Sequence, residues 1–164
     1  MSGVYWFGMN MIIYMAVLPI VIYIVVRMLD AKYRVNGSKL LLVGACLLFS
    51  LSLIIPSPKI HGQDTQFLTH LLGGGVFTGL IWLYFKPLMK NMAWYRELLY
   101  LYALVSGLGV LNELYELFSY EVLGQKQFPL TDTSWDLFAN TLGMLLFYAV
   151  YRGGKYVKRL FFSR

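Results

Sequence analysis

Charged residues are scarce in this chain of 164 residues. They make up 13% of the sequence, whereas hydrophobic residues make up 59%. A water-soluble domain has about a quarter of its residues charged, so this composition excludes an ordinary soluble domain and is typical of a protein embedded in a bilayer. A chain of this length has room for one bundle of helices and for no separate soluble domain.

Cysteine is almost absent, since Cys46 is the only one. A single cysteine excludes a disulfide within the chain and a metal cluster built from cysteines, and its apolar neighbours favour a packing role. The sequence also lacks the HExxH, ExxH and CxxC spacings of common metal sites. No familiar metal motif therefore identifies a function by itself.

Long apolar runs, by contrast, are present. A helix that crosses a bilayer needs about 20 largely apolar residues, and five stretches meet this requirement, two of them near the lower limit. The first has no charge before Arg27 and lacks the basic start and cleavage site of a signal peptide, so we expect it to be retained. The sequence predicts an all-α membrane bundle of five transmembrane helices in one domain, 1–164. The predicted helices cover residues 4–28, 38–55, 66–85, 95–120 and 134–151.

Basic residues are divided unevenly between the two ends of these helices. The segments after the first and third helices and the C-terminal tail contain all fourteen lysines and arginines except Lys59 and Lys126. Lys and Arg accumulate in cytoplasmic loops, which predicts an extracytoplasmic N-terminus and a cytoplasmic C-terminus in the plasma membrane. The net charge of +6 does not indicate a nucleic-acid partner, because the basic residues form no stripe with base-stacking aromatic residues.

Acidic residues gather at the predicted extracytoplasmic end. Only Asp30 and Glu97 fall at the cytoplasmic interface, whereas the other six acidic residues and both histidines fall at or just below the outer surface. The residues at the outer end are Asp64, Glu113, Glu116, Glu121, Asp132, Asp136, His61 and His70.

Helical periodicity places several of these residues on shared faces, because residues three and four apart lie on one side of a helix. The predicted faces contain Gln63, Gln66, His70 and Gly74 on the third helix, Ser106, Gly109, Glu113, Glu116 and Tyr120 on the fourth, and Asp132, Asp136, Asn140 and Gly143 on the fifth. We expect these polar faces, which lie at matched depth, to meet. Small residues (Gly73, Gly74, Gly109 and Gly143) would let the backbones approach closely.

A cluster of carboxylates within a membrane segment requires compensation. Each ionisable residue there costs roughly 2.5–3.5 kcal/mol on insertion scales and marks a candidate functional site. The carboxylates can be protonated, hydrogen-bonded or neutralised by a cation. A divalent cation suits carboxylate and amide oxygens, and an imidazole shifts the preference toward zinc, manganese or iron. The predicted metal ligands are Glu113, Glu116, Asp132, Asp136 and Asn140, and the candidate catalytic residues are Glu113, Glu116 and His70.

Simpler roles exist for the same residues. Asp132, within a Thr-Asp-Thr-Ser segment, can cap the fifth helix, and His70 alone can be a polar packing residue. Glu113 or Glu116 can be held by hydrogen bonds between helices. Asp64 and Glu121 are expected to be solvated loop charges.

The order of the polar residues resembles a known family. Residues 112–116 read NELYE, and residues 131–143 read TDTSWDLFANTLG, with the pattern D-x-x-x-D-x-x-x-N-x-x-G. This order resembles the VanZ-like group of small integral membrane proteins and the related YjdF-like proteins, in which an earlier helix begins with a histidine. The resemblance covers the third to fifth helices, about half the chain. It departs before His70, where Gln66 and Phe67 stand at the position of the usual acidic residue.

The resemblance implies a role in the cell envelope, since the family is named for an association with glycopeptide-antibiotic resistance. Three functions stay open. An enzyme would use the carboxylates, with or without a metal, to activate water or a hydroxyl toward a lipid headgroup or a lipid-linked envelope precursor. A binding or transport protein would receive a cation or proton in the acidic pocket. An accessory protein would use the polar cluster to hold the bundle together or to dock another membrane protein.

Overall fold

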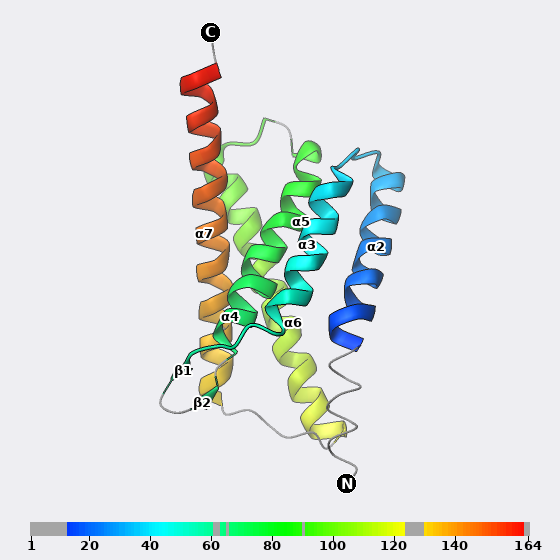
Figure 1. Cartoon of the computed structure of the whole chain (residues 1–164), viewed down its shortest axis with the longest axis vertical. Helices are drawn as coiled ribbons and strands as arrows, with labels where there is room; N and C mark the ends of the chain where they lie inside the picture. Colours follow the sequence, from blue (N-terminus) through cyan, green and yellow to red (C-terminus); the bar gives the residue numbers. More distant parts are fainter. Residues whose placement is uncertain (1–12, 61–62, 65, 90, 124–129, 163–164) are drawn as a thin grey trace.

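The computed structural model describes residues 13–60, 63–64, 66–89, 91–123 and 130–162. This part of the chain consists of helices, their connecting turns and one short hairpin (Figure 1). The predicted all-α class is confirmed. The helical elements are η1 (Ile13–Val17), α2 (Leu18–Tyr33), α3 (Lys39–Ser52), α4 (Phe67–Thr69), η2 (His70–Val76), α5 (Phe77–Phe85), η3 (Lys86–Leu88), α6 (Trp94–Leu123) and α7 (Leu130–Phe162). β1 (Lys59–Ile60) pairs antiparallel with β2 (Gln63–Asp64). The predicted first helix begins at residue 4, and its first part lies outside the described residues.

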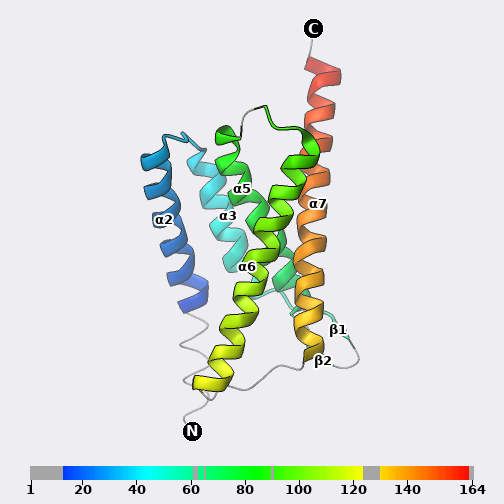
Figure 2. The same cartoon turned by 180° about the vertical axis from the view of Figure 1, so that it is seen from behind.

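The helices form an upright bundle in which successive long helices run in opposite directions (Figures 1 and 2). The hairpin lies at the lower end in Figure 1, hereafter the hairpin end. There α3 and α6 finish and α4 and α7 begin. α7 contacts η2 and α6, whereas α3 contacts α2, α5 and η2. The bundle therefore has η2 at its centre and α2 at its edge.

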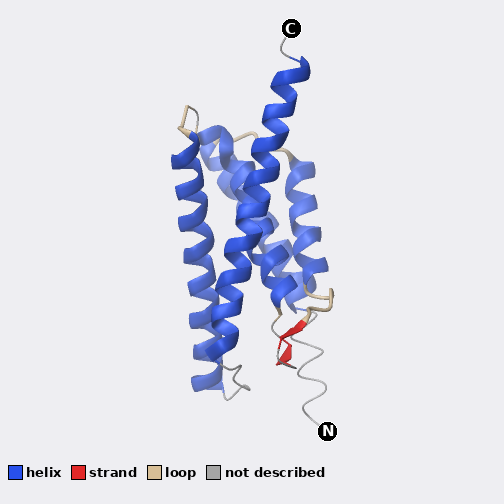
Figure 3. Ribbon diagram, turned by 90° about the vertical axis from the view of Figure 1, so that its left-hand side faces the viewer, coloured by secondary structure: helices blue, strands red, loops and turns tan. Residues whose placement is uncertain are grey.

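Three of the predicted helices differ from expectation in form. The described part of the first opens with a π-helical turn, η1, and α2 continues to Tyr33. The third is one continuous helical stretch whose middle, η2, is a π-helix. The fifth starts at Leu130 and continues to Phe162, so the basic tail is helical and extends beyond the other helices at the opposite end (Figure 3). The extension contains no proline, and its lysines, arginines and leucine are good helix formers that offset the two glycines at 153 and 154.

Large apolar side chains cover the outward sides of the helices. Leu40 is 83% exposed, Val150 76% and Leu99 63%. Within the described residues, Phe67–Leu88 and Trp94–Ser119 are long and apolar enough to cross a membrane, and Lys39–Ser52 is apolar but shorter. Soluble monomers rarely expose such extensive apolar surface.

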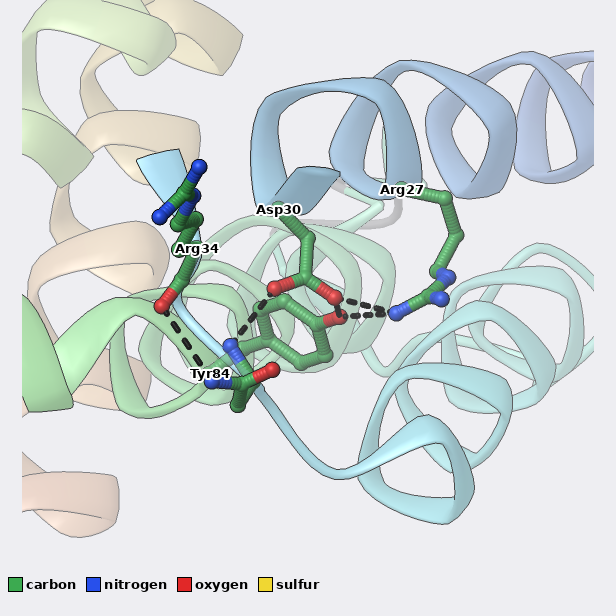
Figure 4. A network of polar contacts seen from close by, with 5 residues as sticks. Arg27, Asp30, Arg34 and Tyr84 are labelled. Atoms are coloured by element: carbon green, nitrogen blue, oxygen red, sulfur yellow. Dashed lines mark hydrogen bonds and ion pairs between the residues drawn. The ribbon is translucent and has the colours of Figure 1, made fainter. Parts of the chain in front are cut away.

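At the end opposite the hairpin, Asp30 joins α2 to α5 (Figure 4). Its carboxylate accepts hydrogen bonds from the hydroxyl of Tyr84 at 2.7 Å, from the backbone N–H of Asn36 at 2.8 Å and from the guanidinium of Arg27. The bond from Tyr84, followed by the contacts with Asn36 and Arg27, lowers the pKa of Asp30. Tyr84 is almost fully buried, and a Cβ on Gly37 would lie 2.5 Å from its ring. The turn between α2 and α3 is therefore closed over this ring.

We expect Tyr84→Phe to lower the Tm of the purified protein by about 2–4 °C. The variant keeps the ring but loses the hydrogen bond that the hydroxyl donates to Asp30 and the one that it accepts from Arg27. The low pKa of Asp30 means that its contribution is present above the ordinary carboxyl value of 3.8 and is lost as the pH falls through the lowered value. The difference between the two proteins should therefore shrink below pH 3.8. Thermal unfolding in detergent across this range measures it, and a constant difference would contradict the role of Asp30.

Candidate functional site

The start of α4 fixes the position of the first candidate residue, His70. Gln66 precedes the helix with a positive φ of 47°, which turns the chain upward from the hairpin. The backbone N–H of Leu68 donates to Ser57 Oγ at 3.0 Å, and Thr69 Oγ1 donates to the carbonyl of Ser52 at 3.1 Å. These bonds attach α4 to the end of α3 and place His70 at the beginning of the π-helix η2. Short π-helical turns are rare and occur frequently at functional sites.

His70 meets acidic residues of two other helices. Its Nε2 lies 3.3 Å from Oδ2 of Asp136 on α7, and the two side chains are 11% and 3% exposed. Glu113 of α6 completes the group, since ligand atoms of all three residues lie within 4.8 Å of one another. We call His70, Glu113 and Asp136 the three-helix group. It contains one imidazole and two carboxylates, and these are donor types that bind metal ions.

Glycines allow the three helices to approach. A Cβ on Gly143 of α7 would lie 2.1 Å from the carbonyl oxygen of Leu71, and one on Gly75 would lie 2.4 Å from the carbonyl oxygen of Asn140. Side chains cannot fit at such distances, so the backbones of η2 and α7 are in direct contact. The prediction that Gly143 permits close approach of the helices is confirmed. The same role of Gly75 was not predicted from the sequence. The consecutive glycines 73–75 were the sequence signal for it.

The side chain of Asn140 occupies the space that two further glycines leave open. A Cβ on Gly74 would lie 1.6 Å from Asn140 Oδ1, and one on Gly109 would lie 3.1 Å from Asn140 Nδ2. Asn140 is 4% exposed. Gly74, Gly109 and Asn140 each lie four residues from a member of the three-helix group, on the side away from the hairpin end, so the amide lies one helical turn deeper in the bundle.

Two buried oxygen atoms near the group lack a hydrogen-bond partner among the described residues. They are Glu113 Oε1 and Asn140 Oδ1. Nor does Glu113 form a salt bridge with any lysine or arginine in the described part of the chain. Buried polar atoms are normally paired, and exceptions point to strain, chemistry or a bound water or ion.

Two further predicted residues, Glu116 on α6 and Asp132 on α7, lie within one helical turn of the group. Glu116 accepts a 2.7 Å hydrogen bond from Nδ2 of Asn112, one turn earlier on α6, and is not a member of the three-helix group. Asp132 lies in the first turn of α7 and not at its N-cap, because the helix begins at Leu130, and its side chain lies outside the described residues. His61 and the side chain of Asp64 also lie outside them.

An aromatic cluster packs beside the site at the hairpin end. The ring of Phe67 on α4 lies 6.3 Å from Trp135 and 6.2 Å from Phe138, both on α7. These contacts hold the starts of α4 and α7 together and so support the contact between His70 and Asp136.

No family model, curated protein or solved structure matches this chain.

Proposed function

We propose that this chain is a VanZ-like membrane protein of the cell envelope that binds a divalent cation in the three-helix group and acts there on a lipid headgroup or lipid-linked precursor. The observation that carries the proposal is the convergence of His70, Glu113 and Asp136, from three helices, within 4.8 Å. Ionisable groups inside apolar helices are costly and mark functional sites by default.

A five-span topology is supported by the exposed apolar side chains and by the two helices long enough to cross a bilayer. The hairpin end would face outward, because the basic extension of α7 lies at the opposite end with Lys155 and Lys158 exposed. Membrane lipids would then surround the bundle, and the three-helix group would open toward the outer leaflet of the plasma membrane.

The cation is supported by the charge of the group. Two carboxylates and one imidazole lie together where Glu113 has no basic partner among the described residues. A divalent cation would neutralise the carboxylates and could bridge them to a phosphate, which is the group shared by lipid headgroups and lipid-linked precursors. Glu113, whose Oε1 has no hydrogen-bond partner among the described residues, would then be placed to take a proton from a bound water.

Two contacts favour a second function, that of an accessory protein with a structural polar network. His70 contacts Asp136, and Glu116 accepts a hydrogen bond from Asn112, so part of the cluster is satisfied without a metal. Such a protein would use the cluster to stabilise the bundle or to dock another envelope protein.

Metal content distinguishes the two functions. We expect the protein purified in mild detergent to carry close to one equivalent of divalent metal, and the Glu113→Gln/Asp136→Asn variant to lose more than nine-tenths of it, because carboxylates provide most of the binding. Elemental analysis of monodisperse protein measures both values.

Glu121→Gln is the matched control, because Glu121 is an exposed acidic residue of the same helix outside the group. It should retain the metal. Absence of metal from the unaltered protein, even after loading with magnesium, calcium, manganese and zinc, would contradict the cation site and leave the accessory role as the better account.

A further inference from the structure

We infer that the three-helix group binds a first-row transition-metal ion of the zinc, manganese or iron(II) type in preference to magnesium or calcium. We also infer that the side-chain amide oxygen of Asn140, Oδ1, is the innermost donor to this ion. This inference rests on the proposed cation site and specifies its metal, its fourth ligand and the direction from which a substrate would reach the ion.

The donor set favours a transition metal. Calcium takes six to eight oxygen ligands, and magnesium keeps most of its water in a near-ideal octahedron. Here one of the donors is the imidazole Nε2 of His70, and its side chain and that of Asp136 are only 11% and 3% exposed. Imidazole combined with carboxylate suits zinc, manganese and iron, whereas purely oxygen sites suit the alkaline-earth ions.

The separation of the donors fits a single small ion. Two ligand atoms that each lie about 2.1 Å from a tetrahedral metal are about 3.4 Å apart. His70 Nε2 and Asp136 Oδ2 lie 3.3 Å apart, and Glu113 reaches the same place within the 4.8 Å spread of the group. A small movement of the Glu113 side chain would bring the third donor to the ion.

Asn140 is the independent indication that something binds in this space. Its side chain is buried to 4% exposure, and Oδ1 has no hydrogen-bond partner among the described residues. The amide projects between η2 and α6, where Gly74 and Gly109 leave room for it. A buried carbonyl without a partner is unfavourable, and a cation seated between the three-helix group and Asn140 would satisfy it.

The arrangement also determines from which side a ligand would reach the ion. Asn140, Gly74 and Gly109 close its inner side, one turn deeper than the three-helix group. The more exposed members, His70 and Glu113, lie toward the hairpin end. With the three-helix group and Oδ1 of Asn140 as ligands, any further coordination position of the ion would face the hairpin end. A ligand such as water or a phosphate oxygen would therefore reach the ion from the hairpin end.

Cobalt(II) alone is a suitable probe, because its visible absorption reports nitrogen and oxygen ligation in sites that accept zinc. We expect titration of the metal-stripped 164-residue chain in detergent to give a saturable visible spectrum at one equivalent. Zinc should displace cobalt at near-stoichiometric amounts, whereas magnesium and calcium should not do so at a thousandfold excess. This competition uses the unaltered chain and requires no variant to fold.

Two variants test the individual donors. His70→Gln should change the cobalt spectrum and weaken binding by at least tenfold, and Asn140→Leu should weaken it by about tenfold or more. Asn112→Leu is the control, because Asn112 is an exposed amide of α6 whose side chain contacts Glu116. It should bind as the unaltered protein does, and each variant is first checked for monodispersity and Tm.

The outcomes separate this inference from the proposed function. Displacement of cobalt by calcium or magnesium as readily as by zinc would overturn the transition-metal preference and leave the cation site standing. Unchanged cobalt binding by folded Asn140→Leu would overturn the role of the side-chain oxygen Oδ1 as a metal ligand. Failure of the unaltered protein to bind any of these ions would overturn the site itself, and with it the proposed function.

Discussion

Gly143→Ala is expected to destabilise the bundle by about 1–3 kcal/mol or more, the cost of forcing an extra methyl group into a close-packed interior. The new Cβ would lie 2.1 Å from the carbonyl oxygen of Leu71 and 2.9 Å from its carbonyl carbon. Both are backbone atoms, so no side-chain rotation can relieve the overlap, and α7 would have to move away from η2. The movement would also separate His70 from Asp136.

The chain provides a matched control in Gly107→Ala. Gly107 lies within α6, and a Cβ there would meet nothing within 4 Å. Since alanine is a better helix former than glycine by about 1 kcal/mol in the helix interior, this variant should be as stable as the unaltered protein or slightly more so. Denaturation in detergent by titrated SDS measures the difference. Equal stability of the two variants would show that α7 and η2 do not touch at Gly143.

The helices could be predicted from the sequence because apolar length and basic flanks are local properties of the chain. Periodicity also placed His70, Glu113 and Asp136 on faces that could meet, and the structure brings them together. Glu116 was included with them because residues three apart share a broad face. In the structure Glu116 is not among the residues whose ligand atoms lie within 4.8 Å of one another, and it accepts a hydrogen bond from Asn112.

Other features could not be predicted, because they depend on how distant segments meet. A π-helical turn closes on the fifth residue and not the fourth, so the face of η2 shifts along the glycine run and brings Gly75 against α7. Ordinary helical spacing cannot reveal this shift. Similarly, nothing local to Asp30 indicates that Tyr84, 54 residues later, donates a hydrogen bond to it.

A double-mutant cycle on His70 and Asp136 should give the second large effect. His70→Leu is expected to cost about 3 kcal/mol, because it removes the imidazole that lies 3.3 Å from a buried carboxylate only 3% exposed. His70→Leu/Asp136→Leu should recover at least 1 kcal/mol of that loss, since replacing both partners of a buried polar contact by apolar groups can be nearly neutral, whereas removing one partner costs the desolvation of the other. SDS titration of the four proteins measures the cycle.

The stability of the double variant then separates a functional site from a structural network. If the polar group serves metal binding, the apolar double variant should fold as well as the unaltered protein, or nearly so, and should contain no metal. A group that exists to hold the bundle together would behave differently: the double variant would be destabilised by about the sum of the two single costs. Asp136→Asn, which preserves shape and removes the charge, shows how much of each loss is electrostatic. A stable, metal-free double variant would mean that the chain retains His70 and Asp136 for chemistry at the hairpin end, even though apolar residues would fold there at no greater cost.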